Sequence, residues 1–442
     1  MIKTFKKGGV HPPEDKISRN AALEQLSPEG IVRIFVSQHT GAPAECVVAK
    51  GDKVKTGQLV AKANGFVSAN VHSSVSGTVV GIEDVADYHG FKKPAICIQV
   101  EGDEWDESID RSPEINRDLS KSAEEILEKI THAGLVGLGG AAFPTHVKLT
   151  VPQGKTAKTI IINGAECEPY LTTDHRVMLE RGEELLIGIE LLKKVVNVDK
   201  AYIGIETNKQ DAINHLTKLT TNHSGIEIVS LQPRYPQGGE KQLIQAIIGR
   251  EVPDRALPVD TGCIVLNVCT TLAVYEAVQK NKPLFENSIT VTGKNLKEQK
   301  NFMVRIGTPL SQLIKAIGGI PENTGKILSG GPMMGRAINN LDAPTLKSSG
   351  SILFITTEES KRGTKSNCIR CSKCVEACPM GLEPYLLCKL AELNMLEDLK
   401  ENSVHACMEC GCCLYTCPAN VPLVDYIRLG KTRAMKFIVK PK

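Results

Sequence analysis

Short apolar runs, each ended by a glycine-containing turn, fill residues 31–100. Runs of this length, rich in valine and isoleucine, are typical of β-strands. The strands predicted here are Ile31–Val36, Cys46–Val48, Leu59–Val60, Val67–Val71, Gly77–Ile82 and Ile96–Val100. The pattern therefore predicts a small all-β module over residues 31–100, preceded by an irregular arm over residues 1–30.

The pattern changes after an acidic linker over residues 101–120. Ser122 and Glu125 form a capping box, which predicts the start of a helix. Strands are then predicted at Ile160–Asn163, Ala201–Glu206, Ile226–Leu231 and Ile264–Val268, alternating with helices near Glu183–Val196, Gln210–Leu219, Lys241–Ile248 and from Thr271. This alternation predicts an α/β domain with a largely parallel sheet over residues 121–285.

Two further modules and a tail follow. Residues 286–346 contain a predicted strand at Ile289–Thr292 and a helix at Leu310–Ile317, which indicate a β-grasp insert. Residues 347–425 are rich in cysteine and include a helical spacer. Residues 426–442 form a basic tail, which we expect to be solvated or to dock to a partner or to anionic lipid. Its basic residues are Arg428, Lys431, Arg433, Lys436, Lys440 and Lys442.

The amino-acid composition argues against two classes of protein, nucleic-acid-binding proteins and membrane-spanning proteins. A formal net charge of +3 and only one Trp, eight Tyr and nine Phe in 442 residues argue against a nucleic-acid-binding surface. No stretch approaches the roughly 18 to 20 apolar residues of a membrane helix, and the N-terminus lacks the apolar core of a signal peptide. We therefore expect a cytoplasmic protein that reaches a membrane only through partners.

The cysteines form two runs with the spacing C-x2-C-x2-C-x3-C-P. The runs are Cys368, Cys371, Cys374 and Cys378, and Cys407, Cys410, Cys413 and Cys417. Both resemble the runs of bacterial two-cluster ferredoxins, in which the fourth cysteine binds the other cluster. The resemblance assigns Cys368, Cys371, Cys374 and Cys417 to one [4Fe–4S] cluster and Cys407, Cys410, Cys413 and Cys378 to a second. It implies an α-helical, two-cluster ferredoxin-like domain.

Structural zinc is the alternative, because paired C-x2-C units also form four-cysteine zinc sites. The third cysteine, the x3 gap and the proline, all repeated, favour iron–sulfur clusters. Cys412 is out of phase with the spacing, and we expect it not to be a ligand. Seven cysteines outside the runs show no disulfide-like spacing, which indicates a reducing compartment. They are Cys46, Cys97, Cys167, Cys263, Cys269, Cys388 and Cys412.

The β module resembles the biotinyl/lipoyl carrier fold, a flattened β-sandwich or barrel-sandwich hybrid. The resemblance rests on Val48–Val54, Gly57–Leu59 and Ser76–Val79. A carrier needs a modifiable lysine on the hairpin between its halves, but residues 63–68 contain none. We therefore expect a structural module of this shape rather than a swinging arm.

A glycine-rich loop runs from Gly134 to Pro144. It follows a helix instead of a strand, which disfavours a dinucleotide fingerprint. Gly154-Lys155-Thr156 is similar to the end of a P-loop, but a P-loop needs a glycine five residues before Gly154, where this chain has Leu149. Glycines at 137, 139 and 140 would let a flat or phosphorylated ligand approach backbone N–H groups, although a structural turn is the alternative. Phe143 could stack on a ring and Lys148 could bind a phosphate.

Two other segments fall where ligands bind in α/β sheets. Asn163–Tyr170 follows the first strand of the sheet, and ligands bind beyond the carboxyl ends of strands. Tyr235–Glu240 opens a helix, whose free N–H groups could bind a phosphate. Helix capping and solvation are the alternative roles of the carboxylates in these segments.

These segments resemble, in the same order, the flavin and NADH loops of the NADH-oxidising subunit of respiratory complex I. Gly134–Lys148 is similar to its GLRGRGGAGFPTGLKW, Asn163–Pro169 to NADESEP, Tyr235–Leu243 to YICGEETAL, and Asn267–Leu272 to NNVETL. The resemblance implies FMN and NADH sites at Gly137, Gly139, Gly140, Phe143, Lys148, Asn163, Glu166, Glu168, Gly238, Glu240 and Asn267. Four positions depart from the family pattern, namely Leu138, Ala165, Gly239 and Val268.

Over its full length the chain resembles the RnfC subunit of the Rnf membrane complex. The resemblance implies a peripheral subunit on the cytoplasmic face that binds FMN and two [4Fe–4S] clusters. It would exchange electrons between NAD(H) and the membrane subunits of an ion-translocating complex, with ferredoxin as a further partner. A cobalamin reductase of similar architecture and an iron–sulfur scaffold without nucleotide binding are the alternatives.

Overall fold

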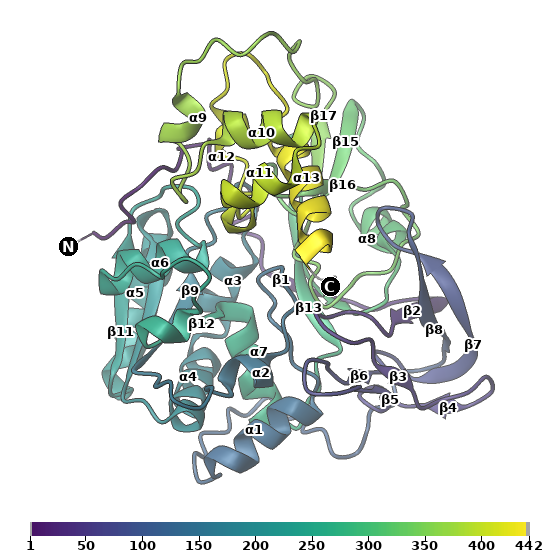
Figure 1. Cartoon of the computed structure of the whole chain (residues 1–442). Coiled ribbons are helices and arrows are strands. Elements are labelled where there is room, and N and C mark those ends of the chain that lie inside the picture. The colour runs from purple at the N-terminus through teal and green to yellow at the C-terminus, as the bar shows by residue number, and fades with distance from the viewer. Residues whose placement is uncertain (1, 439–442) are drawn as a thin grey trace.

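The computed structural model describes the backbone of residues 2–438, folded into four sheets and thirteen α-helices in that part of the chain. The α/β domain and the β module lie side by side, and the cysteine-rich helices sit above them (Figure 1). No helix of residues 2–438 is long and apolar enough to cross a membrane.

The β module contains two small sheets around one apolar core. Its strands are β2 (Ile31–Phe35), β8 (Lys92–Val100), β7 (Gly77–Ala86) and β4 (Lys53–Val54) in one sheet, and β3 (Glu45–Cys46), β5 (Leu59–Lys62) and β6 (Val71–His72) in the other. Val32, Ile34, Ile96 and Ile98 on paired strands are fully buried between the sheets. Buried residues alternate with outer ones in the first part of β2 and of β7, as the pleat of a strand requires.

The α/β domain is built on a four-stranded, entirely parallel sheet. The strand order is β11 (Ile226–Leu231), β10 (Lys200–Glu206), β9 (Thr159–Gly164) and β12 (Cys263–Asn267). Ile160 and Ile162 pack into one apolar core and Ile161 into another, on the opposite face. Such two-sided burial is characteristic of parallel sheets covered by helices.

Helices cover both faces of this sheet. Core residues on one face come from α1 (Ala123–His132), α3 (Thr173–Glu180), α4 (Gly182–Val196), α5 (Gln210–Leu219) and α7 (Val268–Gln279). The other face is covered by α6 (Glu240–Ile248). The short α2 (Thr145–Leu149) follows the glycine loop. Short 3-10 helices occur at Thr207–Lys209, Thr220–Asn222, Pro258–Thr261 and Val404–Ala406.

The third module is a six-stranded sheet with α8 (Leu310–Ala316) packed into its core. Its strand order is β1 (Leu23–Leu26), β14 (Lys300–Arg305), β13 (Glu286–Thr292), β17 (Ser351–Thr356), β15 (Thr324–Ser329) and β16 (Arg336–Ala337). Two of these strands lie outside the expected range 286–346. Residues 23–26 of the arm are an edge strand instead of irregular chain, and 351–356 belong to this sheet because β17 pairs with β13 and β15.

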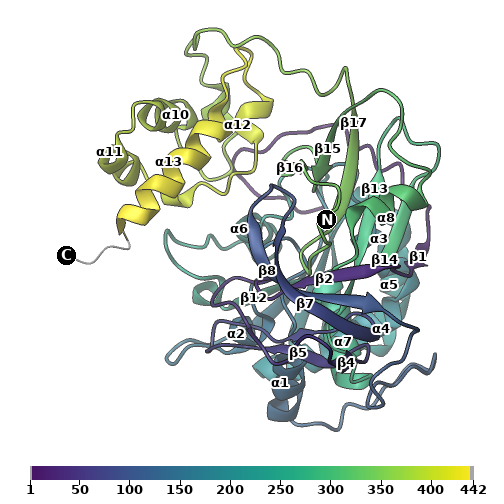
Figure 2. The ribbon, with the colours of Figure 1, turned by 90° about the vertical axis from the view of Figure 1, so that its right-hand side faces the viewer.

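The C-terminal domain is helical. It contains α9 (Lys373–Glu376), α10 (Pro384–Glu392), α11 (Leu396–Glu401), α12 (Cys412–Tyr415) and α13 (Leu423–Ile438), which Figure 2 shows set to one side of the sheets. The expectation of a solvated end is wrong at Ile427 and Ala434, which belong to α13 and are buried against α10 and α11. Docking to a partner or to anionic lipid stays a prediction. Lys440 and Lys442 lie outside the described residues.

Candidate functional site

The predicted nucleotide-binding residues converge at the carboxyl ends of the parallel strands. Asn163 near the end of β9 donates a hydrogen bond from Nδ2 to the Gly238 carbonyl oxygen, at 2.8 Å. Asn267 at the end of β12 lies against the glycine loop, because a Cβ added to Gly139 would be 3.4 Å from the Asn267 Cβ. Four segments far apart in the sequence therefore meet at one edge of the sheet, as expected for an α/β ligand site.

The glycine loop offers backbone N–H groups to a ligand. Gly137 donates to the Phe143 carbonyl oxygen at 2.9 Å, and Leu138 donates to the Thr270 hydroxyl at 2.8 Å. Between these anchors, the N–H groups of Gly139, Gly140 and Ala141 have no hydrogen-bond partner in the described chain, and all three residues are exposed. Successive unpartnered N–H groups suit a phosphate or another anion.

Gly140 leaves room for a ligand beside these N–H groups. Its φ is +107°, a region that favours glycine, and no atom lies within 4 Å of the position that a Cβ would take. A side chain at position 140 would fill this open space. Phe143 is half-buried at the end of the same loop.

Charged residues from two other elements border the loop. The Lys148 ammonium group on α2 forms an ion pair with the Glu240 carboxylate at the start of α6, with 2.6 Å between Nζ and Oε1. Both side chains are partly exposed, so the pair is accessible to a charged ligand. The Asn267 Oδ1 caps α7 by accepting from the Cys269 N–H at 2.8 Å.

The two glutamates of the Asn163–Pro169 loop already accept hydrogen bonds within the protein. Glu166 accepts from the Asp174 N–H at 2.7 Å and so caps α3. Glu168 accepts from the N–H groups of Met333 and Met334, at 2.7 and 3.1 Å, in the turn after β15. Burial raises the pKa of the Glu168 carboxyl group. Glu166 therefore has the helix-capping role that the sequence left open, whereas Glu168 joins the loop to the turn after β15.

Sequence reasoning missed two lysines that support the same loop. Lys16 of the N-terminal arm donates from Nζ to three carbonyl oxygens, those of Glu166, Glu168 and Leu171, at 2.6, 2.9 and 2.7 Å. The buried Lys209 donates to the Ala165 carbonyl oxygen at 2.7 Å. Nothing in the sequence near Lys16 indicates this role, because its partners lie about 150 residues away along the chain.

Asp174 is a further residue that the sequence did not reveal. It accepts hydrogen bonds from the Asn267 Nδ2 at 2.7 Å and from the Cys269 thiol at 3.1 Å. Burial raises the pKa of Asp174 to about 7, with the nearby Glu166 carboxylate as the next cause. Asp174 thus connects the loop after β9 to the end of β12.

The four departures from the complex I pattern have visible packing roles. Leu138, Ala165 and Val268 are buried in the apolar cores of the α/β domain. Gly239 faces the cysteine-rich domain, where an added Cβ would lie 2.9 Å from the Met408 Cε. A side chain at position 239 would require the Gln242 and Met408 side chains to move.

The second set of predicted cluster ligands lines one cavity. Cys378, Cys407, Cys410 and Cys413 line one cavity, and the remaining wall is mainly apolar, with Leu387 of α10 and Ile427 of α13. Burial raises the pKa of Cys407 to about 11, and the thiols of Cys410 and Cys378 act in the same direction. Four cysteines from two segments in an apolar shell fit the donor set of an iron–sulfur cluster.

The first set is more open. Cys368 and Cys371 are exposed, whereas Cys374 and Cys417 are half-buried against the helical core. No group of three or more His, Cys, Asp or Glu side chains within residues 2–438 converges as the ligands of a single metal ion do. Ligands of a four-iron cluster bind separate irons at its corners, so they need not meet at one point.

The cysteine-rich domain packs directly against the segment at Tyr235, against α6 and against the N-terminal arm. The Tyr235 hydroxyl donates to the Cys410 carbonyl oxygen at 2.8 Å, and Gly9 N–H donates to the Ala377 carbonyl oxygen at 2.9 Å. Gln242 of α6 donates to the Pro379 carbonyl oxygen at 3.2 Å. Cys412 is fully buried in this contact and also lines the cavity of the second set. Its expected role outside the ligand set stays a prediction.

Fold and site together define a protein with a nucleotide-type α/β domain and a cysteine-rich helical domain docked on it. Family models match three parts of the chain. They are the RnfC barrel sandwich hybrid domain at residues 3–103, the Nuo51 FMN-binding domain at residues 130–276 and the SLBB domain at residues 288–337.

Curated relatives match nearly the whole chain. The sequence is 46% identical over 406 residues to the RnfC subunit of the proton-translocating ferredoxin:NAD(+) oxidoreductase complex of Clostridium ljungdahlii, covering 91% of this chain and 87% of that one. It is 44% identical to the corresponding subunit of the Na(+)-translocating complex of Acetobacterium woodii, covering 97% and 96%. The chain belongs to the RnfC family, whose members are subunits of the Rnf complex, the ion-translocating ferredoxin:NAD oxidoreductase.

A solved structure shares the fold at lower sequence identity. A chain of an NAD+-reducing [NiFe]-hydrogenase in the H2-reduced state superposes with a TM-score of 0.51 at 19% identity. The match covers 73% of this chain and 64% of that chain.

Proposed function

We propose that this protein is the peripheral, cytoplasmic-face subunit that carries electrons between NAD(H) and the membrane subunits of an ion-translocating complex, with ferredoxin as the other redox partner. The proposal is supported by the names of its relatives at 46% and 44% identity and by the match to the Nuo51 FMN-binding domain. A cobalamin reductase is less favoured, because these relatives align with more than 90% of this chain.

The glycine loop and the edge of the parallel sheet would hold FMN and NADH. The free N–H groups of Gly139 and Gly140 suit the phosphate, and the Lys148–Glu240 pair borders the same region. Bound flavin would supply the change between a two-electron hydride and single electrons. The chain's own part is to hold the nucleotides and to orient the loop after β9 through Lys16 and Lys209.

The two cysteine sets would hold two [4Fe–4S] clusters, with the ligands that the spacing predicts. The set of Cys378, Cys407, Cys410 and Cys413 lies in the buried cavity beside Tyr235. The set of Cys368, Cys371, Cys374 and Cys417 lies farther out and is partly exposed. In this proposal, the cluster in the buried cavity would exchange electrons with the nucleotide domain. The cluster at the exposed set would exchange electrons with a partner.

The domain division predicted from the sequence remains part of this proposal. The units are the barrel-sandwich module, the α/β domain, the β-grasp sheet and the helical cluster domain. Three assignments are adjusted, because β1 and β17 join the β-grasp sheet and α13 joins the helical domain.

The docking of the cysteine-rich domain at Tyr235 is the observation that carries the proposal. Purified protein should contain flavin absorbance and about eight irons per chain, the content of two [4Fe–4S] clusters. Tyr235→Phe removes the hydroxyl that binds the Cys410 carbonyl oxygen, and should slow reduction of the clusters by NADH, measured by stopped-flow absorbance, without loss of iron or flavin.

Tyr415→Phe is the matched control, because the Tyr415 side chain is 51% exposed on the same domain. It should leave the stopped-flow rate unchanged. Absence of flavin from protein that contains both clusters would favour the iron–sulfur scaffold instead. Zinc in place of iron would refute the cluster assignment.

A further inference from the structure

The segment that carries the first cysteine run is unusually open. All residues from 361 to 373 are exposed, including Cys368 and Cys371. The apolar Ile369 between these cysteines is 66% exposed. In Figure 1 the connection from β17 to α9 arches over the end of the molecule farthest from β4 and β5.

Residues 361–373, here called the basic loop, carry only positive charge. The charged residues are Lys361, Arg362, Lys365, Arg370 and Lys373, and the segment contains no Asp or Glu. Arg362 is paired with Asp425 at 2.6 Å, and Lys365 lies 3.6 Å from Glu392. Within residues 2–438, Lys361, Arg370 and Lys373 form no ion pair, so their charges face solvent uncompensated by a side chain.

We propose that the basic loop is the docking surface for an acidic electron-transfer protein or domain. This rests on the proposed function, because the loop holds Cys368 and Cys371 of the outer cluster site. Complementary charge steers association and raises its rate, while a small apolar contact such as Ile369 lets the complex form briefly and dissociate. The redox step is the transfer of one electron from the reduced group at this site to the partner's acceptor, without bond formation or proton transfer.

The basic face of α13 is the other candidate docking surface, but two of its cations bind groups within the protein. On α13, Arg428 is paired with Glu409 at 3.0 Å and Lys431 donates to the Cys407 carbonyl oxygen at 2.6 Å. These two cations stabilise the second cysteine run. The basic loop, which has three uncompensated cations beside two exposed cysteines, is therefore the better docking surface for a redox protein.

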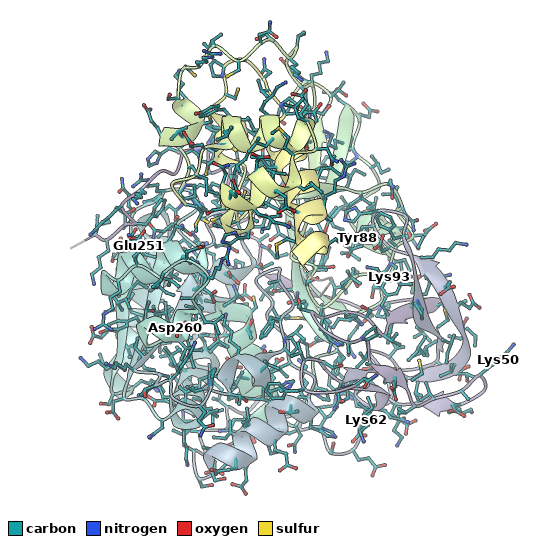
Figure 3. The ribbon with its side chains drawn as sticks, in the orientation of Figure 1. Lys50, Lys62, Tyr88, Lys93, Glu251 and Asp260 are labelled. Atoms are coloured by element: carbon teal, nitrogen blue, oxygen red, sulfur yellow. The ribbon has the colours of Figure 1, made fainter. Side chains whose placement is uncertain are left out.

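The test uses a charge-reversed variant, Lys361→Glu with Arg370→Glu and Lys373→Glu. The matched control reverses three exposed lysines of the barrel-sandwich module, Lys50→Glu with Lys53→Glu and Lys62→Glu. Figure 3 shows Lys50 and Lys62 on the side of the molecule away from the cysteine-rich helices. Both variants change the net charge equally. If the first variant loses iron, the glutamine version of the same three positions replaces it.

Two small proteins of opposite charge serve as acceptors, the acidic one-iron rubredoxin and the basic haem protein cytochrome c. The protein is first reduced with dithionite and freed of excess reductant, so that the measurement does not require NADH oxidation. Stopped-flow rates should show that rubredoxin is reduced faster at low salt than at high salt. The loop variant should slow this reaction by about tenfold or more at low salt, the lower end of electrostatic steering effects. The barrel variant should not change it.

Binding provides a readout that does not depend on electron transfer. Oxidised protein should bind immobilised rubredoxin in surface plasmon resonance at low salt, and the loop variant should not. Equal effects of the loop and barrel variants, or no effect of either, would overturn the proposal. It would also be overturned if the loop variant lost only binding to vesicles containing anionic phosphatidylglycerol, since the loop would then be a lipid contact. Failure of NADH to reduce an intact protein would instead contradict the proposed function alone.

Discussion

At the scale of single residues, Lys16 shows how a distant side chain supports the candidate site. Its ammonium group meets three carbonyl oxygens of the loop that follows β9. Burial lowers the pKa of Lys16, and the neighbouring Lys209 acts in the same direction. Three hydrogen bonds to carbonyl oxygens satisfy the buried ammonium group and fix the backbone of Glu166 and Glu168.

We expect Lys16→Met to destabilise the α/β domain and to lower flavin retention. Each buried carbonyl oxygen left without a donor costs about 1–3 kcal/mol, so the midpoint of thermal unfolding should fall by several degrees. Flavin content per chain, measured by absorbance, should fall with it. Lys7→Met, at an exposed position of the same arm, should change neither quantity.

Gly140 permits a second test at this scale. Gly140→Val places a side chain in the open space beside the loop and strains a backbone with φ of +107°. Flavin retention and NADH-dependent reduction of ferricyanide should be lost while both clusters assemble. Gly154→Val is the matched control, since Gly154 also has positive φ (+81°) and open surroundings but lies outside the site. If both variants retain flavin, the loop is only a turn.

At the scale of elements, the two cysteine runs differ in environment although their spacing is the same. The second run enters α12 within a buried contact with the α/β domain, whereas Cys368 and Cys371 of the first run lie in the exposed basic loop. Cys378 shares a cavity with the second run, which is the exchange of ligands that the spacing predicts.

Cys378→Ser should therefore damage the cluster held mainly by the second run. Iron and sulfide assays should show loss of up to about four irons, the content of one cluster. Electron paramagnetic resonance at low temperature should lose one of two signals. Cys412→Ala is the control, because Cys412 is buried at the domain contact and its thiol faces the Tyr235 carbonyl oxygen at 3.9 Å. Loss of iron in this control would show that Cys412 is a ligand.

At the scale of the whole molecule, Lys347 joins three modules at one buried point. Its ammonium group donates to the Asn70 carbonyl oxygen of the β module at 2.8 Å and to the Gly134 carbonyl oxygen of the glycine loop at 2.7 Å. Its own carbonyl oxygen accepts from Asn287 of the β-grasp sheet at 2.9 Å. Burial lowers the pKa of Lys347 to about 7.

This pKa predicts how stability depends on pH. Between pH 7 and about 10 the unfolded state holds a proton on Lys347 that the folded state has lost, so the free energy of unfolding should rise with pH. The slope for one proton is at most about 1.4 kcal/mol per pH unit. Unfolding midpoints from pH 7 to 9.5 should rise more steeply for the wild type than for Lys347→Met. Equal slopes in the two proteins would show that Lys347 is charged in the folded state.

Many helices and strands could be predicted from the local pattern of apolar and polar residues. All four strands of the parallel sheet, and helices α4 to α7, lie within a few residues of their predicted positions, because burial on both faces leaves continuous apolar runs. The short α3 was missed, because its N-cap residue Thr172 makes no capping hydrogen bond and its capping residue, Glu166, lies outside the local start pattern. In the β module, β4 has only two residues and gave no pattern to detect.

The sequence by itself determined the cysteine spacing, the glycine loop and the strand ends, because each depends on residues that are neighbours along the chain. Only the tertiary structure decided that Glu168 accepts from the turn at Met333, that β1 extends a sheet near residue 301, and that Lys16 supports a loop near residue 168. These contacts join segments more than 100 residues apart. Local periodicity records which face of an element is buried, whereas the identity of the distant partner depends on how the modules pack together.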